Sequence, residues 1–231
     1  MPKVGIIGGD AILEIFRELE SQKIETEYGS VESFVDENLV VIPRHGREIK
    51  KPPHKINHRA NMKAFKDLSV ESIISITSVG SLRRELEPPS ILIPHDYINL
   101  WSIATFFDSD LIHITPELSK ELRESVIKIF RMEGIDVIEN GIYIQTLGPR
   151  LETKAEVRFL KQLADVVGMT MASEATLANE LDIEYADIST VDNYAHGIID
   201  EPLRYDKILE NSKMNMERIR KPLLKIVEEL C

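Results

Sequence analysis

The 231-residue sequence has a single cysteine, Cys231, and no run of apolar residues long enough to cross a membrane. One cysteine excludes a framework of intrachain disulfides and a zinc site built from several cysteines. Basic residues are also scarce: 28 lysines and arginines stand against 39 aspartates and glutamates, for a formal net charge of −11. Nucleic-acid and membrane partners call for a basic face, so we expect neither, although a few placed arginines can still hold a phosphate.

The start of the chain lacks the basic segment and apolar core of a secretory signal, so we expect a cytoplasmic protein. No internal repeat, low-complexity linker or change of composition marks a domain boundary. With 43% hydrophobic and 29% charged residues, the chain is able to bury a sizeable core. Its length suits one large domain, and we expect a single domain over residues 1–231.

Short apolar runs alternate with segments of helical periodicity along the whole chain. Strands are predicted at residues 4–7, 39–43, 73–77, 91–94, 166–169 and 185–191, and a hairpin with an Asn140-Gly141 turn is predicted within 136–145. Helices are predicted at residues 11–22, 57–68, 115–133, 153–164, 174–181 and 205–230. This order predicts a single-domain three-layer α/β/α fold with a mixed central sheet.

The stretch 73–82 is the predicted centre of the sheet. Its first residues suit a strand covered on both faces, and it then breaks at Thr77-Ser78-Val79-Gly80-Ser81, where small residues expose backbone N–H groups and hydroxyls. Ligands of open α/β sheets sit beyond the carboxyl ends of the strands, so a substrate is expected here. The alternative interpretation is a buried strand that ends in a polar turn.

Two other turns follow predicted strands. Arg44-His45-Gly46-Arg47 is either an anion clamp, because guanidinium groups bind phosphate oxygens in pairs, or a solvated basic turn. Asp10, after Gly8-Gly9, fits best as the N-cap of the next helix.

Seven pieces of the sequence together resemble the trimeric purine nucleoside phosphorylases, which include the methylthioadenosine and methylthioinosine phosphorylases. In order they are Val4-Gly5-Ile6-Ile7-Gly8-Gly9, Arg44-His45-Gly46-Arg47, Pro52-Pro53-His54-Lys55-Ile56-Asn57, Thr77-Ser78-Val79-Gly80-Ser81-Leu82, Gly148-Pro149-Arg150-Leu151-Glu152-Thr153, Val167-Gly168-Met169-Thr170 and Asn193-Tyr194. The resemblance implies that inorganic phosphate, as co-substrate, cleaves a purine nucleoside to a free purine and a pentose 1-phosphate. It also implies no metal or organic cofactor, and a homotrimer or a dimer of trimers.

The resemblance also implies roles for single residues. The implied phosphate ligands are Arg44, His45, Thr77, Ser78 and Thr170. The implied nucleoside ligands are Leu151, Glu152, Met169, Asn193 and Tyr194. Glu152, Asn193 and His45 are expected to take part in catalysis. His113 resembles a histidine that family members contribute to a neighbouring subunit; the alternative is a surface histidine before a helix.

The expected base site favours 6-oxopurines. Glu152 is placed to accept from the protonated N1 of hypoxanthine or guanine, and the Asn193 amide to bind O6 or N7. Adenine has no hydrogen on N1, and the adenosine-type members carry an aspartate where this chain has Asn193. Asp192 lies one place too early, and a shift of one residue would reverse the preference. Glu152 is alternatively a helix-initiating acid.

Two questions stay open in the sequence. The family has threonine or serine where this chain has Asp10, so Asp10 either turns away to cap the helix, binds phosphate in protonated form, or abolishes phosphate use. The last case would leave a nucleosidase or a non-catalytic nucleoside-binding protein. The 5′ group of the substrate is expected near His196, Ile198 and Leu203, with a slight preference for methylthioinosine; methylthioadenosine phosphorylase is the alternative enzyme.

Overall fold

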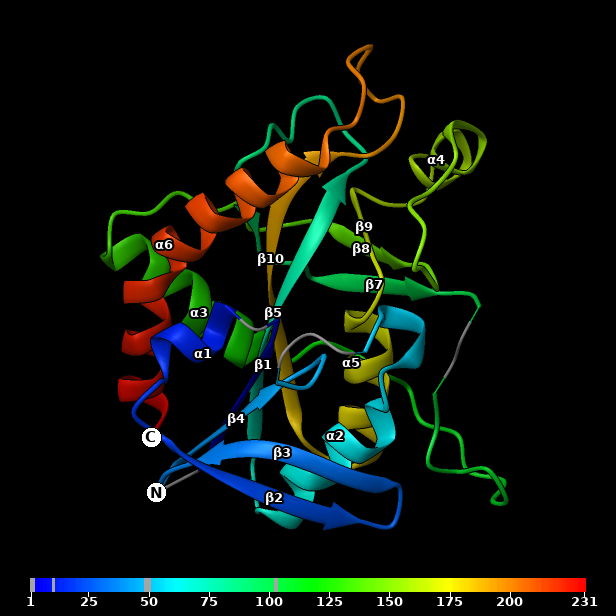
Figure 1. The fold of residues 1–231 in the computed structure, drawn as a ribbon. Coiled ribbons are helices and arrows are strands. Elements are labelled where there is room, and N and C mark those ends of the chain that lie inside the picture. Colours follow the sequence, from blue (N-terminus) through cyan, green and yellow to red (C-terminus); the bar gives the residue numbers. More distant parts are fainter. Residues whose placement is uncertain (1–2, 10, 48–50, 102–103) are drawn as a thin grey trace.

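The computed structural model describes residues 3–9, 11–47, 51–101 and 104–231 (Figure 1). Within these residues ten strands form one mixed sheet, with the order β2-β3-β4-β1-β5-β9-β8-β7; β10 branches from β5, and β6 pairs with β10. The strands are β1 Val4–Gly8, β2 Glu20–Thr26, β3 Gly29–Val35, β4 Leu39–Pro43, β5 Ser72–Ser81, β6 Ser90–Leu92, β7 Asp96–Asn99, β8 Ile142–Gln145, β9 Val166–Gly168 and β10 Glu184–Tyr194. The helices are α1 Ala11–Ile15, α2 His58–Asp67, α3 Lys120–Met132, α4 Lys154–Leu160, α5 Met171–Glu180 and α6 Tyr205–Leu230, with a 3-10 turn η1 at Pro53–Lys55.

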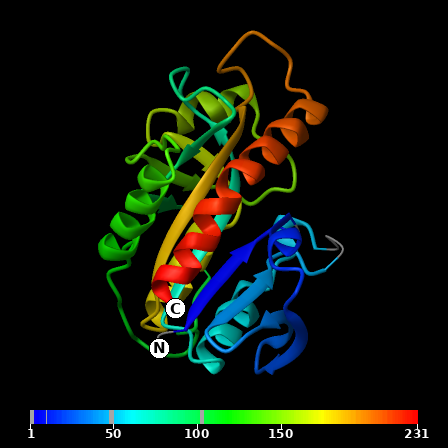
Figure 2. The same ribbon diagram turned by 90° about the vertical axis from the view of Figure 1, so that its left-hand side faces the viewer.

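Helices cover both faces of this sheet, which confirms the predicted three-layer α/β/α fold. Ile74 and Ile76 of β5 pack with α3 and α6 on one face, whereas Ile73 packs with α2 and α5 on the other. This alternation follows from the period of two along a strand. Figure 2 shows α6 lying along one face of the sheet, with β10 and β5 behind it.

Strand β5 is the centre of the sheet, as the sequence predicts, but it does not end at Thr77. It pairs in parallel with β10 from Ser72 to Ser81, so the backbone ladder carries the strand through the small residues. The predicted break is therefore wrong. A register shift in β10 between Val191 and Asn193 comes at the end of this ladder, where bulges commonly re-aim side chains.

The predicted helix 11–22 is also wrong in its second half. Helix α1 ends at Ile15, and residues 20–26 form β2, which pairs antiparallel with β3 around a turn at Glu27-Tyr28. The apolar spacing that suggested a helix comes from Ile12, Phe16 and Leu19, which all pack into the core beneath α3 and α6. A short helix and the turn that follows it therefore pack their apolar side chains into the same part of the core.

Two further boundaries differ from the prediction. Helix α3 begins at Lys120 and not at 115, because the Ser119 side chain accepts the N–H of Leu122 as an N-cap. The predicted hairpin at Asn140-Gly141 is absent from the described residues. Residue Ile138 forms a lone parallel bridge with Leu92, and β8 pairs in parallel with β7 and β9.

Candidate active site

A cavity of about 490 Å³ opens at the carboxyl ends of β1, β5 and β10, a volume in the range of small-molecule sites. Its walls come from segments that are far apart in the sequence: the end of β4, the end of β5, the loop before α4, the turn between β9 and α5, and the end of β10. These segments bring eight of the predicted residues to one cavity: Arg44, His45, Ser78, Leu151, Glu152, Met169, Thr170 and Asn193.

The other predicted residues lie elsewhere. The Thr77 side chain is buried and its hydroxyl donates to Asp187, whereas the Tyr194 hydroxyl donates to the carbonyl of Arg84. His113 is exposed on the segment between β7 and α3, outside the cavity lining. Asp10 lies outside the described residues.

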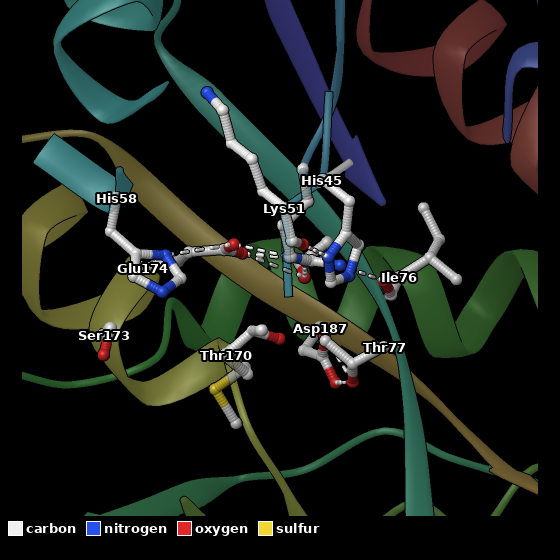
Figure 3. A network of polar contacts seen from close by, with 12 residues as sticks. His45, Lys51, His58, Ile76, Thr77, Thr170, Ser173, Glu174 and Asp187 are labelled. Atoms are coloured by element: carbon white, nitrogen blue, oxygen red, sulfur yellow. Dashed lines mark hydrogen bonds and ion pairs between the residues drawn. The ribbon is translucent and has the colours of Figure 1, made fainter. Parts of the chain in front are cut away.

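The buried Arg44 guanidinium is held mainly by the protein itself. Its Nε and Nη2 donate to the two oxygens of Glu174 at 2.5 and 2.8 Å, while Nη2 also reaches Ser75 Oγ and Nη1 reaches the Ile76 carbonyl (Figure 3). An arginine has five N–H donors, so among the described residues one hydrogen, on Nη1, is left for a ligand. Arg44 is thus able to offer an anion one hydrogen bond and a positive charge, not the paired grip expected from the sequence.

Glu174 keeps this guanidinium in place and fully charged. Burial alone would raise the pKa of the Glu174 carboxyl, but the Arg44 charge and its hydrogen bonds outweigh burial and bring that pKa to about 2. Burial would likewise lower the pKa of Arg44, and Glu174 holds it above its ordinary value. Tyr185 adds a hydrogen bond to Glu174 at 3.0 Å, and His58 Nδ1 lies 3.6 Å from it.

Three further groups surround the Arg44 end of the cavity. Thr170, directly before α5, is buried, and its side chain makes no capping hydrogen bond to the helix. His45 Nδ1 lies 2.7 Å from the Lys51 carbonyl, and because a carbonyl only accepts, this nitrogen carries the hydrogen. The exposed Ser78 hydroxyl donates to Asp192.

The other end of the cavity pairs a carboxylate with an amide. Glu152 is 8% exposed, and its Oε1 accepts from Thr146 Oγ1 at 2.7 Å, which leaves Oε2 as an acceptor for a ligand. Asn193 Nδ2 donates to the Tyr194 carbonyl at 2.8 Å. A Cβ on Gly80 would stand 3.2 Å from Asn193 Nδ2, so a glycine there leaves the amide room.

Asp192 points away from this cavity. It is buried, and its carboxylate accepts from Thr190 and from Asn215 of α6 at 3.0 and 2.9 Å as well as from Ser78. Burial raises the pKa of Asp192. Thr190 and Asn193 of β10 line the cavity and Asp192 does not, so the alternative alignment with Asp192 at the base site has no support.

A third part of the cavity lies against α6. Apolar and polar side chains share this part: Leu203, Ile208 and Met216 line it together with His196, Tyr205 and Ser212. Ile198, which the sequence also suggested for this region, packs instead in a small core cluster beneath α4.

Sequence reasoning missed Glu174 and Asp187, the two carboxylates beneath the cavity. The available signal was a charged residue inside an otherwise small and apolar helix, Met171–Glu180, and another inside the buried strand β10. Fully buried carboxylates require partners, so each of them pointed to a polar network. Within the described part of the chain, no cluster of metal-ligating side chains is present.

Fold and cavity together define a class: an α/β protein with one cavity that has a buried arginine at one end and a carboxylate beside an amide at the other. Comparison with known proteins agrees. The phosphorylase superfamily matches residues 3–228, and the chain belongs to this family. The predicted family is therefore confirmed. None of the helices in the described residues has the length and apolar character to span a membrane.

The similar proteins act on several purine nucleosides. The chain is 47% identical to a probable 6-oxopurine nucleoside phosphorylase of Archaeoglobus fulgidus, over 98% of this chain and 94% of that protein. It is 39% identical to a probable S-methyl-5′-thioinosine phosphorylase of Methanocaldococcus jannaschii, over 98% of this chain and 90% of that protein. The structure of methylthioadenosine phosphorylase from Schistosoma mansoni in complex with adenine matches with a TM-score of 0.88 at 25% identity, over 100% of this chain and 92% of that one.

Proposed function

We propose that this chain catalyses the phosphate-dependent cleavage of 6-oxopurine nucleosides, which releases the free purine and a pentose 1-phosphate. The observation that carries the proposal is the pairing of Glu152 and Asn193 at one end of the cavity that has Arg44 at the other. The relatives named above support phosphorolysis. The positions of these three side chains support binding of phosphate at the Arg44 end of the cavity and of the purine at the other end.

Phosphate is the nucleophile in this reaction, and it binds at the Arg44 end. The guanidinium charge, its remaining Nη1 hydrogen and the Thr170 hydroxyl hold the anion beneath the sugar, where it attacks the anomeric carbon. Glu174 fixes the guanidinium beforehand, so little reorganisation is needed during the reaction. Positioning and fixed donors of this kind supply catalysis without a cofactor.

The departing purine gains negative charge as the glycosidic bond breaks. The Asn193 amide donates to O6 or N7, and the Glu152 carboxylate accepts from N1–H, so both contacts favour a 6-oxopurine. Adenine presents a lone pair at N1, which the ionised Glu152 repels. Buried polar groups that lose their partner in this way discriminate strongly between substrates.

The apolar side chains along α6 favour a nucleoside with an apolar 5′ group. Leu203, Ile208 and Met216 suit a 5′-methylthio group, and His196 and Ser212, which line the same part of the cavity, are able to bind a 5′-hydroxyl. Methylthioinosine is therefore the preferred substrate in this proposal, and inosine is second.

The proposal includes a homotrimer or a dimer of trimers as the active form. Trp101, Leu147 and Phe159 are half exposed and line a second, largely apolar cavity of about 310 Å³ that Glu152 also borders. An exposed apolar patch of this kind beside a site is typical of a subunit interface. His113, exposed and outside the chain's own cavity, is then available to a neighbouring subunit.

A substrate panel tests the proposal. Inosine, methylthioinosine and methylthioadenosine are incubated separately with the protein and saturating phosphate, and kcat/KM is measured for each. We expect methylthioinosine first, inosine second and methylthioadenosine last. A methylthioadenosine rate equal to or above the rates of both 6-oxopurines would contradict the assignment of Glu152 and Asn193.

A further inference from the structure

A second carboxylate lies beneath the anion end of the cavity. Asp187 of β10 is fully buried, and its two oxygens accept from the Thr77 hydroxyl at 2.9 and 3.1 Å and from the Ser189 hydroxyl. Figure 3 shows the Asp187 and Thr77 side chains turned toward each other from adjacent strands. Neither the expected mechanism nor the packing of β10 requires an acid at this position.

Asp187 has little positive charge to balance its own. The cation that acts on it is Arg44, whose guanidinium is already bound to both oxygens of Glu174. Burial, weakly opposed by the hydroxyls and Arg44, raises the pKa of Asp187 to about 6. Around neutral pH this carboxylate is close to the point at which it takes up a proton.

The other titratable groups near Asp187 do not replace it as the proton acceptor. Burial raises the pKa of Tyr143 and Tyr185, so both phenols stay neutral, and Arg44 keeps Glu174 ionised. The charged or titratable groups around Asp187 are Arg44, Glu174, Tyr143 and Tyr185, with His58 behind Glu174 and His45 at the cavity wall.

We propose that phosphate binding is coupled to protonation of Asp187, which acts as a positioning residue through Thr77. The inference rests on the proposed function, because it requires the anion to bind at Arg44. A dianion beside Arg44 and Thr170 faces an ionised Asp187 across a buried site, and repulsion in such a medium is strong. Protonation of Asp187 removes this repulsion.

The same proton changes what Thr77 is able to do. While Asp187 is ionised, its carboxylate takes the hydrogens of both Thr77 and Ser189. Once protonated, Asp187 donates one hydrogen bond itself, to Thr77 or to Ser189, and one hydroxyl hydrogen is released. The Thr77 hydroxyl is then free to turn toward the anion, which is the role that the family resemblance gives this residue.

Sulfate is the probe that tests the coupling, because it keeps both charges throughout the neutral range and phosphate does not. Calorimetric titration with sulfate at about pH 7, in two buffers of different ionisation enthalpy, gives the number of protons taken up. We expect roughly half to one proton per sulfate, and an affinity that falls by up to about tenfold per pH unit above pH 6.

The variant Asp187→Asn is expected to bind sulfate without the proton uptake of the unmodified protein, and with a flatter pH profile. Asp36→Asn is the control, because Asp36 is exposed between β3 and the amino end of β4, away from the carboxyl ends of the strands where the cavity opens, and it keeps the wild-type values. Unchanged proton uptake in Asp187→Asn would assign the proton to another group and overturn the inference.

Two further outcomes separate this inference from the proposed function. Sulfate binding without proton uptake in the unmodified protein overturns the coupling and leaves the anion site intact, whereas no saturable sulfate binding overturns both. If Asp187→Asn does not fold, an infrared difference spectrum of the unmodified protein with and without sulfate decides. The carbonyl band of a newly protonated carboxyl supports the inference, and its absence overturns it.

Discussion

In the proposed function, the choice of base depends on Glu152. Glu152→Gln replaces an acceptor by an amide that must turn its oxygen to N1–H and that carries no charge. We expect kcat/KM for methylthioinosine to fall roughly 30- to 150-fold, which corresponds to a loss of about 2–3 kcal/mol of transition-state stabilisation. Steady-state kinetics measure the loss, and the KM for phosphate is the internal control. A comparable rise in the phosphate KM would mean that Glu152 belongs to the anion end.

Asn193 is expected to set the preference between 6-oxo- and 6-aminopurines. Asn193→Asp introduces a carboxyl that, when protonated, is able to donate to a purine nitrogen, and we expect the methylthioadenosine to methylthioinosine ratio of kcat/KM to rise by about tenfold or more. Asp192→Asn is the neighbouring control, since Asp192 faces α6, and it leaves the ratio unchanged. If this kcat/KM ratio stays constant in Asn193→Asp, the proposal that Asn193 contacts the purine base is refuted.

Single residues show where sequence reasoning succeeds and where it stops. Arg44 and His45 were found because they lie in a turn whose composition suggests an anion ligand, and Glu152 was found through the family resemblance of residues 148–153. The hydrogen bonds that consume Arg44 and Thr77 were not found, because their partners Glu174 and Asp187 lie 130 and 110 residues away in the sequence. Only folding brings them together.

Helix α5 is joined to the end of β4 by the buried pair of Arg44 and Glu174. Glu174→Gln leaves the guanidinium buried without its counter-charge, and we expect the free energy of unfolding to fall by about 3–5 kcal/mol. Denaturant unfolding measures it. Glu156→Gln is the control, because Glu156 forms an exposed pair with Arg150, and a much smaller loss is expected there. Equal losses in the two variants would contradict the assignment.

The same pair gives a pH dependence of known sign. The folded pKa of Glu174 is about 2, below the ordinary carboxyl value, so its stabilising effect is fully present above about pH 4.5 and is lost as the pH falls toward 2. The difference in unfolding free energy between the unmodified protein and Glu174→Gln should therefore shrink over that window. A difference that grows on acidification would contradict the pairing.

Helices and strands were predicted well where the apolar residues follow one clear period, and poorly where pairing with distant strands determines the secondary structure. Helix α6 matches its predicted bounds because Ile219, Leu223 and Ile226 repeat at helical spacing. The strand β2 was missed because its residues have no apolar alternation and are held mainly by β3. The hairpin predicted at Asn140-Gly141 was wrong because β8 pairs in parallel with β7 and β9 and not with the segment just before it.

The whole molecule is expected to assemble. Light scattering should give three or six times the 26.3 kDa chain mass. Phe159→Asp places a charge in the apolar patch beside Glu152 and should lower that mass. Leu224→Asp is the matched control: Leu224 is similarly exposed but lies on α6, away from the patch, and this variant keeps the oligomer. A monomeric unmodified protein contradicts the expectation outright.

The overall architecture was predictable because alternating strands and helices allow few arrangements of a mostly parallel sheet. The position of the site at the carboxyl ends of the strands follows from the same arrangement. The branch formed by β10 on β5 and by β6 on β10 was not predictable, because it depends on long-range pairing that no local pattern records.

Phosphate dependence is the most direct measure of what this protein does. Purified protein is incubated with methylthioinosine or inosine, with and without phosphate; purine release is followed by ultraviolet absorbance, and the sugar product is identified by carbon and phosphorus NMR. Phosphorolysis requires a pentose 1-phosphate, formed only when phosphate is present. Free pentose, released at the same rate without phosphate, would contradict it and would identify a hydrolase in its place.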